Sequence, residues 1–222
     1  MPAVLLINPN ISPETTAMMH RLLRDGLPAA IEVVSATACR GAPMITTEAE
    51  LAVAVDQVVA IGRARAKEMS AIVIGAFGNP GLEVLRAAVE VPVIGIGEAS
   101  MRQAAADGRR FGVATTTPGL DASIARAAAG LGLGALFTGT RISPGDPLEL
   151  ASQPRLQDER LAEAVAACIA DGAQAVVIGG GPLAEAAVRL GARFDVPVIS
   201  AVAAAAREIE RLLMPGPARY KA

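Results

Sequence analysis

A short run of residues that occurs twice decides the fold: Val73-Ile74-Gly75-Ala76 and, much later, Val177-Ile178-Gly179-Gly180. A second shared run follows each copy, Val91-Pro92-Val93-Ile94 in one case and Val196-Pro197-Val198-Ile199 in the other. The offset is 104 residues between Ile74 and Ile178, and 105 between Pro92 and Pro197. Because two independent pairs of segments are separated by nearly the same number of residues, we predict two similar halves of about 100 residues, an ordinary domain size.

On both sides of these repeated segments, short aliphatic runs typical of buried strands alternate with segments of helical periodicity. Strands are expected near residues 4–7, 31–34, 71–75, 91–94, 111–114, 135–138, 175–178 and 196–199. Helices are expected near 14–23, 46–65 (capped by Thr46 or Thr47), 100–107, 119–130, 157–171, 183–192 and 201–213. Continuous apolar strands between helices predict parallel sheets covered on both faces, so the fold class is doubly wound α/β.

Four loops follow strand ends and are expected to meet. Asn8-Pro9-Asn10 matches Thr115-Thr116-Thr117 weakly as a third element of the repeat. Ligands of open α/β sheets bind at the carboxyl ends of the strands. We therefore expect the loops at 8–12, 76–81, 115–118 and 180–183 to line one cleft between the halves. We expect residues 1–97 with 200–222 to form the first half and residues 98–199 the second.

Composition excludes several classes of protein. The chain has 222 residues, a net charge of −2 and only 2% aromatic residues, so neither charge-driven nucleic-acid binding nor a base-stacking platform is expected. Glycines break the longest uncharged run, 127–140, which is too short for a membrane span. The apolar start without a basic region predicts no secretory signal, and two cysteines support no disulfide framework, so a cytoplasmic location is expected.

Four segments, in order and at the right spacing, resemble the aspartate/glutamate/hydantoin racemase superfamily, most closely its hydantoin and allantoin racemase branch. The resemblance covers nearly the whole chain. The segments are Leu6-Ile7-Asn8-Pro9-Asn10 with Ser12, Ile74-Gly75-Ala76-Phe77-Gly78-Asn79-Pro80-Gly81-Leu82, Val91-Pro92-Val93-Ile94-Gly95-Ile96-Gly97-Glu98-Ala99, and Asp171-Gly172-Ala173.

The resemblance implies two halves related by a pseudo-two-fold axis. It also implies an enzyme without cofactor or metal, assembled as a homo-oligomer and acting on a small-molecule substrate. In the family, each half offers one cysteine at a strand end, and the two thiols exchange the proton of the substrate's α-carbon from opposite faces. Inversion without a cofactor needs two such acid/base groups and donors for the enolate. Here Ala76 occupies the first cysteine position and Gly180 the second, so two-thiol racemisation is not expected.

The other candidate acid/base groups are weak replacements. Cys168 lies within a helical period and is expected to be buried as a small apolar residue. Cys39, just after the second strand, is a less favoured reactive thiol. His20, the single histidine, is expected on a solvated helix face, and Glu98 is expected as a surface carboxylate at a helix start, with a general base as the alternative.

The remaining candidates are binding residues, each with a structural alternative. Asn10 and Ser12 can bind a carboxylate or ring carbonyl, or merely form an Asn-Pro turn that caps a helix. Thr116 and Thr117 can donate hydroxyl hydrogen bonds, or cap the helix at Pro118. The glycine-rich loops can bind a ligand through backbone N–H groups exposed at helix starts, or they can be ordinary turns. The candidate binding residues in these loops are Phe77, Gly78, Asn79 and Gly181.

Three functions compete at this stage. The first is a superfamily enzyme acting on a small carboxylate or a cyclic imide or ureide such as a hydantoin, with hydrolysis or elimination as thiol-independent chemistries. The second is a ligand-binding protein that has lost the reaction. The third is a dinucleotide-binding module suggested by Gly95-Ile96-Gly97; it is disfavoured because Ser100 replaces the last glycine and no acidic residue ends the next strand.

Overall fold

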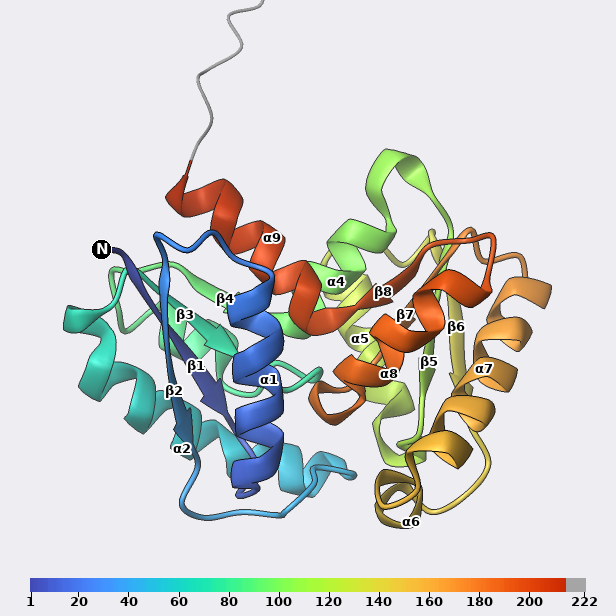
Figure 1. Ribbon diagram of the computed structural model, residues 1–222, viewed down its shortest axis with the longest axis horizontal. Helices are drawn as coiled ribbons and strands as arrows, with labels where there is room; N and C mark the ends of the chain where they lie inside the picture. The colour runs from blue at the N-terminus through green and yellow to red at the C-terminus, as the bar shows by residue number, and fades with distance from the viewer. Residues whose placement is uncertain (215–222) are drawn as a thin grey trace, which may run out of the picture.

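Two four-stranded parallel sheets lie side by side in the computed structural model, which describes residues 1–214 (Figure 1). The first sheet has the order β2-β1-β3-β4, with β1 at Ala3–Asn8, β2 at Glu32–Thr37, β3 at Ala71–Ile74 and β4 at Val93–Gly95. The second has the order β6-β5-β7-β8, with β5 at Phe111–Thr115, β6 at Phe137–Ile142, β7 at Ala175–Ile178 and β8 at Val198–Ser200. The strand order is the same in both halves, as the repeat predicts.

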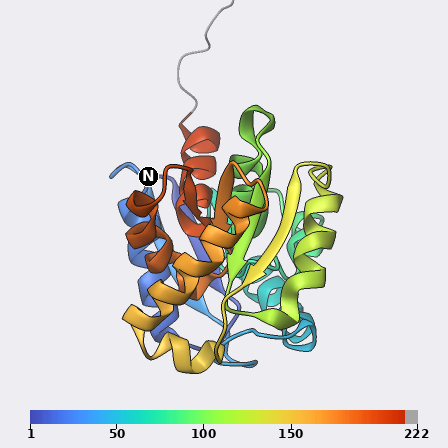
Figure 2. The ribbon, with the colours of Figure 1, turned by 90° about the vertical axis from the view of Figure 1, so that its right-hand side faces the viewer.

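Helices connect the strands and cover both faces of each sheet. Figure 2 shows α5 and α7 on opposite sides of the second sheet. The helices are α1 (Pro13–Asp25), α2 (Glu48–Arg65), α3 (Leu82–Arg86), α4 (Ile96–Ala104), α5 (Asp121–Gly130), α6 (Pro147–Ala151), α7 (Pro154–Ala170), α8 (Ala184–Leu190) and α9 (Ala201–Leu213). This arrangement confirms the doubly wound α/β class.

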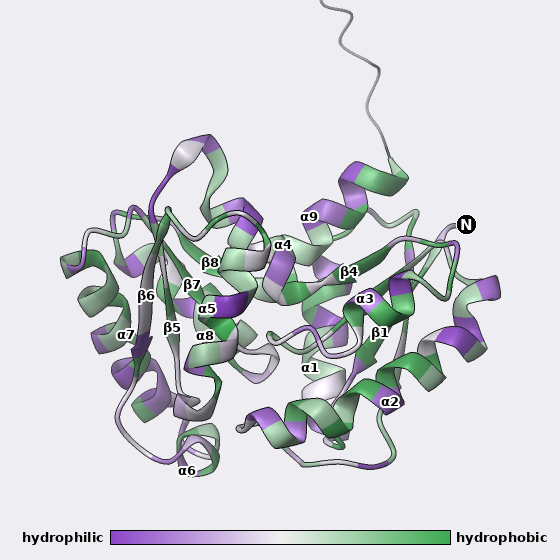
Figure 3. Cartoon of the chain, turned by 180° about the vertical axis from the view of Figure 1, so that it is seen from behind, coloured by the Kyte–Doolittle hydropathy of each residue, from purple (hydrophilic) through white to green (hydrophobic). Residues whose placement is uncertain are grey.

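The core follows from the two-residue period of the strands. Val4 and Leu6 of β1 face a central cluster, whereas Leu5 and Ile7 face a separate cluster under α2. The central cluster also holds alternate residues of β5 and β7, together with buried residues of α1, α4 and α9. One apolar core therefore joins the inner faces of the two sheets. Figure 3 shows β3 and β4 mostly green, whereas the edge strand β6 is pale to purple.

Local capping fixes two helices beside the strand ends. The Thr47 side chain accepts from the Glu50 backbone N–H and the Glu50 carboxylate accepts from the Thr47 N–H, a capping box that begins α2. The Ser12 hydroxyl accepts from the Thr15 N–H and begins α1. Of the two candidate caps of the second helix, Thr47 is the one used.

Some predicted bounds were wrong. Helices α3 and α6 were not predicted because each has only five residues and no full apolar period. The fourth helix begins at Ile96, not near residue 100, since it follows β4 without a loop. Strand β6 is displaced from 135–138 because it is a half-exposed edge strand containing Gly139, Thr140 and Arg141 and has no continuous apolar run.

The division into 1–97 with 200–222 and 98–199 stays a prediction. All four strands of the first sheet precede residue 98, and α9 contacts both α4 and α1. The predicted part at 215–222 lies outside the described residues. Within residues 1–214, no helix is long and apolar enough to cross a membrane.

Candidate functional site

The ends of β1 and β5 form the same kind of turn in the two halves. At the end of β1, the Asn8 side chain donates to Asn10 Oδ1 (2.7 Å) and accepts from the Asn10 backbone N–H (3.2 Å). At the end of β5, Thr115 Oγ1 lies 2.9 Å from Thr117 Oγ1 and accepts from the Thr117 N–H (3.4 Å). The weak match between Asn8-Pro9-Asn10 and Thr115-Thr116-Thr117 is therefore a structural equivalence.

The ends of β3 and β7 are equivalent too. Gly75 N donates to Ile7 O (2.8 Å) in the first half, and Gly179 N donates to Ala114 O (2.9 Å) in the second. Ala76 and Gly180 are the next residues, so they occupy corresponding places. Their backbones differ, since Gly180 has a φ of +153° whereas the φ of Ala76 is not positive.

Four strand-end loops enclose one cavity between the halves, which offers about 50 Å³ to the centres of water molecules. The predicted residues on its wall are Asn10, Ala76, Phe77, Gly78, Thr116, Thr117, Gly180 and Gly181.

Close contact between the loops explains the glycines at 179 and 181. A Cβ on Gly179 would lie 3.1 Å from the Phe77 ring, and one on Gly181 would lie 2.4 Å from the Gly75 carbonyl oxygen. The two halves therefore meet at these glycines, directly beside the cavity.

The cavity wall is mostly apolar and carries no charged or titratable side chain among the described residues. Its polar side chains are Asn10, Thr116 and Thr117, which are 4%, 2% and 9% exposed. The backbone N–H groups of Phe77, Gly78 and Gly181 also make none of the hydrogen bonds found within residues 1–214. The arrangement can hold a small polar molecule by hydrogen bonds, but the wall offers it no general base.

Ser12 and Asn79 were predicted to bind substrate, and the structure places both elsewhere. Neither lines the cavity. Ser12 caps α1, and Asn79, at a φ of 49°, accepts with Oδ1 from the Gly97 N–H (3.1 Å). Both side chains thus shape the loops without reaching the cavity.

The glycines of Gly95-Ile96-Gly97 have a structural purpose. A Cβ on Gly97 would lie 2.0 Å from the Phe77 carbonyl oxygen, and one on Gly95 would lie 2.2 Å from Asn79 Oδ1. These glycines let α4 begin against the 77–79 loop. The dinucleotide interpretation therefore loses the feature that suggested it.

Neither cysteine lines the cavity. Cys168 is a residue of α7, is 1% exposed and packs against Gly112 of β5, which confirms its expected burial. Burial raises the pKa of its thiol to about 11. Cys39 is exposed, and its Sγ donates to Gln57 Oε1 (3.3 Å) outside the cavity wall.

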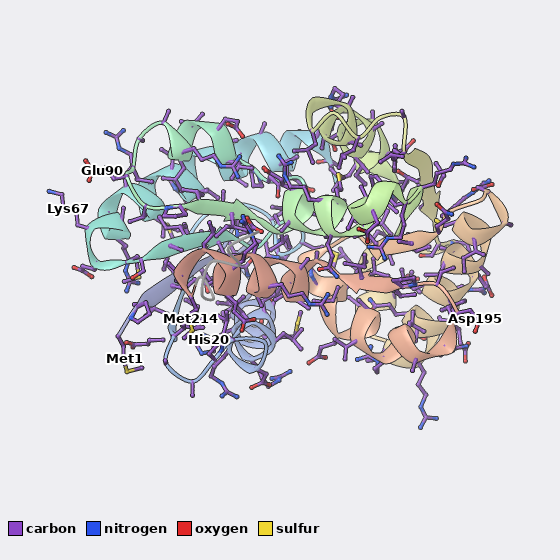
Figure 4. The ribbon with its side chains drawn as sticks, turned by 90° about the horizontal axis from the view of Figure 1, so that it is seen from above. Met1, His20, Lys67, Glu90, Asp195 and Met214 are labelled. Atoms are coloured by element: carbon purple, nitrogen blue, oxygen red, sulfur yellow. The ribbon has the colours of Figure 1, made fainter. Side chains whose placement is uncertain are left out.

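His20 and Glu98 also lie outside the cavity. Figure 4 labels His20 on α1. The His20 Nδ1 atom is enclosed and has no hydrogen-bond partner among residues 1–214, so the prediction of a solvated face is wrong for that atom. The Glu98 carboxylate, 14% exposed, pairs with Arg86 Nη1 and Arg102 Nε, each at 3.0 Å, which supports a structural carboxylate over a general base.

Sequence reasoning missed the apolar part of the wall. The segment after β2 contributes Met44 and Ile45, and helices contribute Leu51 and Ile124. The 38–47 segment carries no repeat or turn signature that assigns it to the cavity. Within residues 1–214, no group of three or more His, Cys, Asp or Glu residues is placed to hold a metal ion.

Comparison with known proteins agrees with this architecture. The family model described as Asp/Glu/Hydantoin racemase matches residues 4–209. A hydantoin racemase from Rhizobium meliloti is 33% identical over 221 residues, which cover 97% of this chain and 90% of that protein.

Two solved structures are also similar. The allantoin racemase from Klebsiella pneumoniae has a TM-score of 0.90 and 29% identity, covering 96% of this chain and 88% of that one. The allantoin racemase from Pseudomonas fluorescens has a TM-score of 0.89 and 26% identity, with coverages of 95% and 90%. The chain therefore belongs to the Asp/Glu/hydantoin racemase family.

Proposed function

We propose that the cavity between the halves binds a small carboxylate or a cyclic imide or ureide of the hydantoin type, and that the chain does not racemise it with two thiols. The names of the relatives, hydantoin racemase and allantoin racemase, support this ligand class. One observation carries the claim that the chain does not racemise its ligand with two thiols. The cavity wall contains Ala76 and Gly180 and, within the described residues, no titratable side chain.

The resemblance assigns positions 76 and 180 to the two family cysteines. A two-base inversion needs a group on each side of the α-carbon, and losing one such group costs about 10²–10⁴ in rate. With neither thiol present, binding without racemisation is the function that this wall supports best.

A thiol-independent hydrolase or lyase is the second candidate. The free N–H groups of Phe77, Gly78 and Gly181 favour it, because such donors stabilise an oxyanion. A water molecule held by the Thr116 hydroxyl would have to supply the nucleophile or base. Either candidate works without a cofactor. A cytoplasmic location and a homo-oligomer remain predictions from the sequence.

Calorimetry with hydantoin, together with proton NMR of its ring CH₂ in deuterated water, tests the proposal. We expect saturable binding and no exchange beyond the buffer rate, and iodoacetamide should change neither result. Asn10→Ala should weaken binding about tenfold, because it removes a donor from the cavity. Ser12→Ala is the matched control: it alters the same turn outside the wall and should leave affinity unchanged. Rapid wild-type exchange would refute the proposal.

A further inference from the structure

The hydrogen bonds of the second-half turn determine which way the Thr117 hydroxyl points. Thr115 Oγ1 donates to the Gly179 carbonyl oxygen at 2.8 Å, and a carbonyl oxygen can only accept. A threonine hydroxyl has a single hydrogen. In the 2.9 Å contact between Thr115 Oγ1 and Thr117 Oγ1, the hydrogen therefore belongs to Thr117.

The consequence reverses the expected role of Thr117. Its proton is committed to Thr115, which is fully buried. The Thr117 oxygen keeps both of its lone pairs to accept hydrogen bonds, and Thr117 lies on the wall of the cavity. Thr117 therefore presents an acceptor to a ligand, where the sequence suggested a donor. The side chain makes no cap bond to the helix that begins at Pro118, so capping does not compete for it.

Asn10 belongs to the first half and offers the cavity a hydrogen-bond donor, whereas Thr117 offers an acceptor. Its Oδ1 accepts from Asn8 Nδ2 (2.7 Å) and from the Ser12 N–H (3.0 Å). These two bonds fix the orientation of the carboxamide, and its Nδ2 donates to no atom of the described residues. Asn10 thus offers the cavity a donor.

This pattern distinguishes ligand classes. The free backbone N–H groups of the wall can serve the oxygen of a carboxylate or of a carbonyl alike, so they do not separate the two classes. Thr117 does, because a carboxylate only accepts hydrogen bonds and beside Thr117 leaves an acceptor facing an acceptor; among the described residues, no charged side chain of the wall compensates its burial. An imide or ureide places an N–H next to a C=O, which satisfies both Thr117 and Asn10.

We propose that the Thr117–Thr115–Gly179 hydrogen-bond chain makes Thr117 a specificity-determining acceptor, so that the cavity selects neutral ligands containing a C(=O)–NH unit and rejects carboxylates. This inference rests on the proposed function and names the ligand class of the same cavity.

Calorimetry with three probes tests it: hydantoin, 1,3-dimethylhydantoin, which has no N–H, and hydantoate, the ring-opened carboxylate. The wild-type chain should bind hydantoin at least about tenfold more tightly than either other probe. Thr117→Val should weaken hydantoin about tenfold and leave hydantoate unchanged or tighter, a divergence that a general loss of structure does not produce.

Two further variants complete the test. Thr115→Val frees the Thr117 hydroxyl to donate, so hydantoate should gain affinity relative to hydantoin. Thr138→Val is the matched control: it removes a hydroxyl that donates to Phe111 O (3.1 Å) away from the cavity wall, and should leave the hydantoin-to-hydantoate ratio unchanged.

The outcomes separate the two proposals. Hydantoate binding as tightly as hydantoin, or Thr117→Val weakening both probes equally, would overturn this inference and leave the cavity as a ligand site. If none of the three probes binds the wild-type chain, the proposed function and this inference both fail.

Discussion

The two halves share a backbone plan around the cavity but present different chemistry to it. In the first half, the side chain of Asn8 anchors the turn to α1, donating to Ser12 O (3.0 Å) and Thr16 Oγ1 (2.9 Å). In the second, Thr115 anchors the corresponding turn to the end of β7 through Gly179 O. Repetition of a fold therefore does not repeat its hydrogen-bond polarity, and a ligand between the halves has two unlike sides.

The residues after β3 and β7 differ in the same way. The φ of Ala76 is not positive, whereas Gly180 has a φ of +153° and would place a Cβ 3.2 Å from Leu183. The two positions correspond in the repeat but do not tolerate the same side chains. Substitutions at matched places in the two loops can test this difference.

The largest effect is expected at the contact between the halves. Gly181→Ala places a methyl group 2.4 Å from the Gly75 carbonyl oxygen and 2.8 Å from Met19 Sδ, so the loops must separate. We expect the free energy of unfolding, measured in urea, to fall by about 3 kcal/mol. The control Gly130→Ala, at the end of α5 with no atom within 4 Å, should instead raise it by about 0.5–1 kcal/mol. Equal effects of the two substitutions would rule out the close contact.

A smaller loss is expected for Gly180→Cys. The side chain must adopt a φ that residues other than glycine rarely take, and it must displace Leu183 slightly. We expect a loss of about 1–3 kcal/mol in the same urea measurement. No loss would show that the Gly180 backbone relaxes freely.

The smallest effect is expected for Ala76→Cys, the matched substitution in the first half. Ala76 lines the cavity, so one added sulfur atom has room there. We expect the free energy of unfolding to change by less than about 0.5 kcal/mol. A loss as large as that of Gly180→Cys would remove the distinction between the two positions.

The sequence predicted the sheets and the cavity better than the roles of individual side chains. Many residues contribute to the pattern of aliphatic strands and to the 104-residue repeat. These patterns therefore predicted two halves with the same arrangement of strands and four loops that meet between them. The sequence did not show that Ser12 and Asn79 lie outside the cavity wall, because a polar residue in a turn can face either the ligand or the backbone. The acceptor role of Thr117 depends on Gly179, which is 62 residues away in the chain and has no local signature.

Chemical-shift mapping of the ¹⁵N-labelled chain with hydantoin tests the central claim, that the ligand lies between two unlike strand-end turns. We predict that the Asn10 side-chain amide and the backbone amides of Gly78 and Gly181 shift with one dissociation constant. Resonances of the separate depression between β4 and α9, such as those of Arg207 and Glu208, should stay in place. Shifts confined to that depression, with the Asn10 amide unchanged, would contradict the account.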